Sequence, residues 1–118
     1  MTRTRDQILA LPAGRALDAL VAERIFSRHR ADFPGVNGES HFWTAVERYS
    51  TEIAAVWDVV ECLQDRMFTL HLRTFKRNRW ELATASFRRE GENGDEAVLC
   101  STPHAICIAA LLTTLENL

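Results

Sequence analysis

The sequence lacks the short motifs that mark the common catalytic and metal sites. It contains no Cys-x-x-Cys, no His-Glu-x-x-His and no Gly-x-Ser-x-Gly, which are the spacings of zinc sites, zinc proteases and serine hydrolases. It has no glycine-rich phosphate loop, because Gly91 and Gly94 lie in an acidic stretch that would repel phosphate. We therefore expect no catalytic residues, no bound metal and no cofactor.

Several larger features are also missing. No apolar run approaches the roughly 20 residues that span a bilayer, and MTRTRDQ at the start is not followed by the apolar core of a secretory signal. The net charge of −2 gives no bulk attraction to a membrane or to nucleic acid. Three cysteines without a close-spaced pair (Cys62, Cys100 and Cys107) are typical of buried thiols in a reducing cytoplasm, with redox or metal use as the alternative.

One helix is strongly predicted, between Tyr49 and Met67. Apolar residues recur at steps of three and four and form one stripe: Ile53, Val56, Trp57, Val60, Leu63 and Met67. Ser50 and Thr51 stand where a helix N-cap belongs, because a hydroxyl there accepts a backbone N–H of the first turn. We expect the rest of the domain to pack against this stripe.

The remaining patterns predict a small α+β domain. Residues 5–11 favour a short helical turn and residues 13–26 a helix with Arg15, Asp18 and Glu23 on its exposed side. Residues 68–73, 80–87 and 97–101 favour strands, and a final helix starts at Thr102-Pro103. The prediction is one domain, residues 1–118, with a three-stranded antiparallel meander sandwiched by helices in the order α-α-β-β-β-α.

Two further expectations concern less regular parts of the chain. Residues 27–48 form a long inserted loop, which should fold back on the domain because it carries Phe33, Phe42 and Trp43. The last helix is apolar around most of its circumference, so it is either buried on more than one side or in contact with another copy. A homo-oligomer is therefore expected.

Three runs carry a resemblance to a known family: GR-x-LD-x-LVAE at 14–23, YST-x-I-x-x-x-W-x-VVE at 49–61, and TP-x-AIC-x-AAL at 102–111. With these runs the chain resembles the phage ABA sandwich domain, a group of small phage and prophage proteins. The resemblance covers nearly the whole chain except residues 27–48. It implies an α-β-α layered fold, a phage or prophage origin and hence the cytoplasm of a host cell. It implies no activity.

A candidate ligand site lies at the starts of two helices. Hydroxyls and backbone N–H groups at a helix N-terminus favour anions, and cationic or aromatic side chains nearby would add charge and stacking. The candidate residues are Arg15, Trp43, Arg48, Tyr49, Ser50, Thr51, Thr102 and His104. The alternative is that the hydroxyls are ordinary caps and the tyrosine is a core residue.

Three functions remain open on the sequence. The first is a non-enzymatic phage accessory protein that binds and sequesters a small anionic host ligand, such as a nucleotide immune signal, as an anti-defence protein. The second is an oligomeric structural or protein-interaction module. The third is a small metal-dependent hydrolase that uses Asp58, Glu61 and Asp65, although such a row is more often a solvated helix face. The basic stretch Arg73–Arg79 is a weak indication of nucleic-acid binding at this net charge.

Overall fold

A computed structural model describes residues 4–27, 35, 38, 42, 46–77, 80–89, 97–99 and 101–115. Its elements are α1 (Arg5–Leu9), α2 (Arg15–Arg24), α4 (Ile53–Asp65), β1 (Thr69–Arg77), β2 (Trp80–Arg88), β3 (Ala97–Leu99) and α5 (Thr102–Leu115). The structure confirms a compact α+β domain with antiparallel strands. Within the described part of the chain, no helix is long and apolar enough to cross a membrane.

The sheet is dominated by the β1–β2 hairpin, which pairs from Thr69 opposite Arg88 to Arg77 opposite Trp80. The short strand β3 pairs with β2 at three positions, which gives the order β1-β2-β3. Alternation sets the two faces of the hairpin. Leu70 and Leu72 pack against the core, whereas the intervening positions of β1 are exposed.

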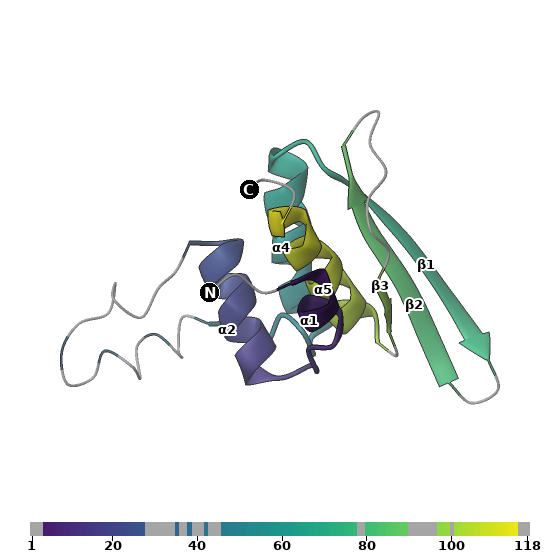
Figure 1. Ribbon diagram of the computed structural model, residues 1–118, viewed down its shortest axis with the longest axis horizontal. Coiled ribbons are helices and arrows are strands. Elements are labelled where there is room, and N and C mark those ends of the chain that lie inside the picture. Colours follow the sequence, from purple (N-terminus) through teal and green to yellow (C-terminus); the bar gives the residue numbers. More distant parts are fainter. Residues whose placement is uncertain are drawn as a thin grey trace.

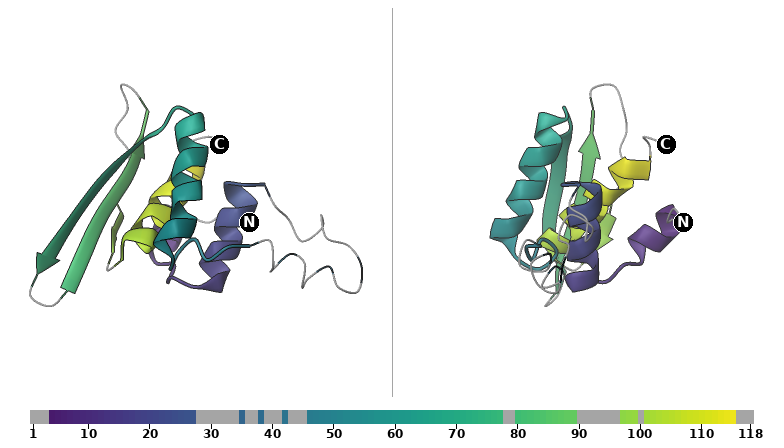
Figure 2. Two further views of the ribbon diagram at one scale, coloured as in Figure 1. Left: turned by 180° about the vertical axis from the view of Figure 1, so that it is seen from behind. Right: turned by 90° about the vertical axis from the view of Figure 1, so that its left-hand side faces the viewer.

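The described helices all lie on one side of this sheet (Figures 1 and 2). Helices α4 and α5 form the layer next to the strands, α2 lies beyond them, and α1 lies beside α5 (Figures 1 and 2). A helical layer on the other face, which the sandwich prediction requires, is not found among the residues that the structure describes. The exposed side chains on β1 include Thr69, His71 and Arg73. This face of the strand is polar, and an antiparallel sheet can expose such a face to water.

Helix α5 lies at the centre of the domain. It contacts β2, β3, α1, α2 and α4, and every residue from Ala105 to Leu112 is at most 3% exposed. The apolar circumference that the sequence shows is thus covered within one chain, by the sheet on one side and by helices on the others. Of the two explanations offered for that pattern, burial on several sides is the one observed.

Helix α4 is amphipathic as predicted, but its buried stripe is shifted. Val56, Val60 and Leu63 are buried, together with Ala55 and Val59. The placement of three other residues in the core is wrong, because Ile53 is 48%, Trp57 47% and Met67 79% exposed. The small and β-branched side chains of the observed stripe let α4 approach the alanine-rich α5 closely, and the larger indole stays outside.

The end of α4 explains the position of Met67. The amide of Met67 donates to the Gln64 carbonyl at 2.9 Å and the amide of Phe68 donates to the Leu63 carbonyl at 3.0 Å. This is the Schellman arrangement, in which the residue after the C-cap takes a left-handed conformation. Met67 has φ 71°, so its side chain turns away from the core while Phe68 and Leu63 are buried together.

Only a few residues of the expected 27–48 insertion are described. Phe42 and Val46 are buried members of the hydrophobic core, which agrees with the expectation that this segment folds back on the domain. Phe33 and Trp43 lie outside the described residues. The boundaries of the insertion within a single domain 1–118 stay a prediction.

Candidate functional site

The start of α2 is joined to the segment before α4 by a buried polar contact. Asp18 accepts the Ser50 backbone N–H at 2.8 Å and the Ser50 hydroxyl at 2.6 Å on the same oxygen, Oδ1. Asp18 is 1% exposed and Ser50 is fully buried. The Gly14 amide in turn donates to Ser50 Oγ at 3.0 Å. These bonds satisfy buried polar groups that would otherwise be costly.

This contact corrects two predictions. Asp18 was expected on the exposed side of its helix, but it is buried because Ser50 supplies it with two donors. Ser50 and Thr51 were expected to cap α4, but the helix starts at Ile53 with Glu52 at the N-cap and no side-chain cap bond. The Ser50 hydroxyl therefore donates to Asp18 of α2 and does not cap α4.

Arg15 adds a second connection at the same place. One guanidinium nitrogen, Nη2, donates to the Val46 carbonyl at 3.1 Å. The other, Nη1, lies 3.4 Å from Asp18 Oδ2. Because the Arg15 side chain remains 42% exposed, it is held by these two contacts and still faces solvent. A guanidinium fixed in this way is suited to binding an anion with little further loss of freedom.

A cavity of about 250 Å³ lies at this junction, lined by Gly14, Arg15, Asp18, Arg48 and Thr51. We call it the basic cavity, because two guanidinium groups line it against one carboxylate, Asp18, which accepts from Ser50 and pairs with Arg15. The positive end of α2, a helix of ten residues, lies at the same point. The combination provides charge and hydrogen-bond donors for a small anion.

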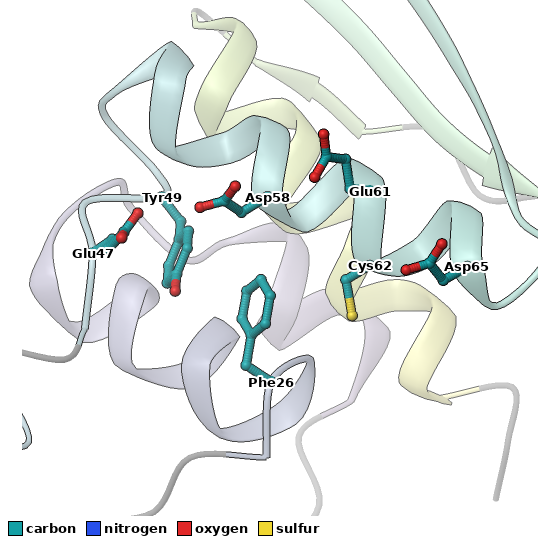
Figure 3. Close-up of a pocket in the computed structure, with 7 residues that line it drawn as sticks. All are labelled: Phe26, Glu47, Tyr49, Asp58, Glu61, Cys62 and Asp65. Atoms are coloured by element: carbon teal, nitrogen blue, oxygen red, sulfur yellow. The ribbon is translucent and has the colours of Figure 1, made fainter.

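A second cavity, of about 360 Å³, lies along α4, between this helix, the segment before it and Phe26 just after α2 (Figure 3). We call it the acidic groove, and its lining residues are Phe26, Glu47, Tyr49, Asp58, Glu61, Cys62 and Asp65. The rings of Phe26 and Tyr49 stack with centroids 5.1 Å apart at an interplanar angle of 20°. The α4 carboxylates project separately along the helix (Figure 3). Among the residues that the structure describes, no group of three histidines, cysteines or acids is placed to hold a metal ion.

The predicted candidate residues divide between these places. Arg15, Arg48 and Thr51 line the basic cavity, with Ser50 buried behind them. Tyr49 is 3% exposed and stacks on Phe26 along the acidic groove. Trp43 lies outside the described residues.

The start of α5 does not contribute to the basic cavity. Thr102 and His104 are half-buried and neither belongs to its lining. The His104 ring places Nε2 2.7 Å from the Leu11 carbonyl, and Nε2 carries the proton in this contact because a carbonyl only accepts. His104 thus joins α5 to the connection between α1 and α2. The basic cavity instead unites the α2 start with the segment before α4.

Residues 19–111 match the model of the phage ABA sandwich domain. The chain belongs to this family. No curated protein and no solved structure matches it, so the family is the extent of what the comparisons show about its biology.

Two residues of this phage-family protein were missed as site residues although a sequence pattern contained them. Gly14 and Asp18 both belong to the GR-x-LD run that carries the family resemblance. Gly14 has φ 148°, a conformation that favours glycine. An aspartate one turn into a helix is ordinarily read as a favourable surface charge, and only the fold shows that a serine 32 positions later reaches it.

The expectation of buried thiols is confirmed for Cys107, which is buried, but Cys62 is only half-buried. Burial raises the pKa of the Cys107 thiol, and the nearby Asp18 carboxylate raises it further, so this cysteine stays protonated and unreactive near neutral pH. Cys62 is half-buried and its thiol lies 3.7 Å from the Ile25 carbonyl. Cys100 is outside the described residues.

Proposed function

We propose that this member of the phage ABA sandwich family acts by binding, without chemical change, and that it sequesters a small anionic host ligand such as a nucleotide immune signal. The observation that carries the proposal is the basic cavity, in which Arg15 and Arg48 meet the positive end of α2. The Arg15 contacts to Val46 and Asp18 support it further, because a pre-positioned guanidinium loses less freedom on binding. Thr51 adds a hydroxyl.

The test is calorimetric titration of the protein with cyclic mononucleotides, cyclic dinucleotides and inorganic phosphate. Arg48→Ala is the most informative variant, because Arg48 is exposed and its removal should leave the fold intact. A charge-assisted hydrogen bond contributes about 1.5–3 kcal/mol, so we expect affinity to fall about tenfold or more. Arg24→Ala, at the opposite end of α2, is the matched control and should bind as the wild type does.

Two results would count against the proposal. One is no heat with any of the nucleotides. The other is an equal affinity of the Arg48→Ala and Arg24→Ala proteins, which would place the anion elsewhere. Binding to phosphate alone, with no gain from the nucleoside part, would restrict the proposal to a phosphate site.

The interaction-module alternative keeps one supporting observation. Helix α5 is fully used inside the domain, so it does not support the expected homo-oligomer, but α4 exposes two large apolar residues, Ile53 and Trp57. Oligomeric state stays a prediction, tested by sedimentation at micromolar concentration. The hydrolase alternative has less support, since the carboxylates of α4 project separately (Figure 3). If Asp58→Ala left a measured turnover unchanged, that alternative would be excluded.

A further inference from the structure

The outward face of α4 combines exposed apolar groups with concentrated negative charge. Ile53 and Trp57 are each about half exposed, one helical turn apart on the same side. The i, i+4 ridge that they begin continues through Glu61 to Asp65, both exposed. A half-exposed tryptophan on a regular helix is not part of the core, and tryptophan is enriched in protein interfaces.

Charge determines what this face can accept. Besides the ridge, Asp58 and Glu52 are exposed on α4 or at its start, and Glu47 lies across the acidic groove. A second copy placed on a two-fold axis would bring these carboxylates against their own equivalents, since such an interface uses the same patch twice. Like charges that face each other oppose association. A complementary occupant must therefore be basic.

The acidic groove has a shape and lining that fit one basic side chain. Its volume is about 360 Å³. The half-buried Phe26 ring, stacked on the buried Tyr49, provides an aromatic surface beside carboxylates on α4. A guanidinium stacks on aromatic rings and pairs with carboxylates in the same plane. The groove lies directly beside the exposed ridge, because Asp58, Glu61 and Asp65 line it.

We propose that the outward face of α4 is a docking surface for a basic, amphipathic segment of a partner protein. Ile53 and Trp57 pack against the apolar side of that segment, and an arginine of the segment enters the acidic groove. The mode is that of a helix laid along a groove. This docking surface is separate from the basic cavity, which lies at the start of α2. A small anion and a basic partner are therefore held by different residues.

The probe is a fluorescently labelled peptide with leucines at helical spacing and arginines between them, titrated by anisotropy. The matched peptide has glutamate in place of each arginine. We expect the arginine peptide to bind and to weaken as salt is raised. Trp57→Ala and Asp58→Asn should each weaken binding about tenfold, whereas Asp6→Asn on α1 should leave it unchanged. Circular dichroism verifies that each variant is folded.

Three results would overturn the proposal. The first is equal binding of the arginine and glutamate peptides. The second is an affinity for the arginine peptide that neither Trp57→Ala nor Asp58→Asn changes. The third is a wild-type dimer in sedimentation that Trp57→Ala converts to a monomer, which would make a second copy the occupant of this face.

Discussion

Replacing Asp18 with alanine should destabilise the domain strongly. The substitution leaves the Ser50 amide, now 2.8 Å from Asp18 Oδ1, buried without this acceptor. The Ser50 hydroxyl, now 2.6 Å from the same oxygen, keeps the Gly14 carbonyl as an acceptor at 3.2 Å. Each buried group left unsatisfied costs about 1–3 kcal/mol. The Arg15 contact adds little, because that guanidinium is 3.4 Å away and its side chain is 42% exposed. We expect a loss of about 1–3 kcal/mol in the free energy of unfolding, mainly from the unsatisfied Ser50 amide.

Urea unfolding followed by circular dichroism measures this loss as a shift of the midpoint at constant slope. Asp58→Ala, at an exposed position of α4, is the matched control and should change stability by less than about 0.5 kcal/mol. The Asp18→Ala/Ser50→Ala double variant should lose at least about 1 kcal/mol less than the sum of the single variants, because the two residues contact each other. A loss below about 1 kcal/mol for Asp18→Ala, or strict additivity, would refute the reasoning.

Other predictions concern the ends of helices and the thiols. Met67→Gly should stabilise the domain by about 0.5–1 kcal/mol, because a non-glycine residue at φ 71° is strained. The control Gln64→Gly, within α4, should lower the stability by about 1 kcal/mol. Urea unfolding measures both changes. Arg66→Ala should lower the free energy of unfolding by about 1–2 kcal/mol, because Arg66 donates to the Ile25 carbonyl at the end of α2 at 2.7 Å. An unchanged urea midpoint would contradict this. Because burial raises the pKa of Cys107, native protein treated with iodoacetamide at pH 8 should be labelled at Cys62 before Cys107. Peptide mass spectrometry measures this, and equal labelling of these two cysteines would contradict it.

The element types followed from sequence wherever one local pattern prevailed. The two-residue alternation at Leu70 and Leu72 gave the first strand, and the steps of three and four at Val56, Val60 and Leu63 gave the central helix. The side of that helix facing the core did not follow, because Ile53 and Trp57 fit the same spacing as Ala55 and Val59. Choosing between them requires knowing that α5 approaches closely enough to favour small side chains.

The candidate site was partly predictable for a related reason. Arg15, Arg48 and Thr51 were selected as neighbours of helix starts, and the structure brings them to one cavity. Thr102 and His104 were selected on the same argument, but the direction in which a helix points depends on tertiary packing, and α5 begins elsewhere. The Asp18–Ser50 contact joins residues 32 positions apart, a distance that no local pattern reports.

The most direct test of the binding account is recovery of the ligand. The protein is mixed with a cyclic dinucleotide, the free nucleotide is separated by ultrafiltration, and the retained fraction is released by heat and analysed by chromatography. The account predicts that the free nucleotide is depleted and that the released nucleotide is unchanged, with depletion reduced by Arg48→Ala. Absence of depletion across the nucleotides tested, or release of a hydrolysed product, would contradict it.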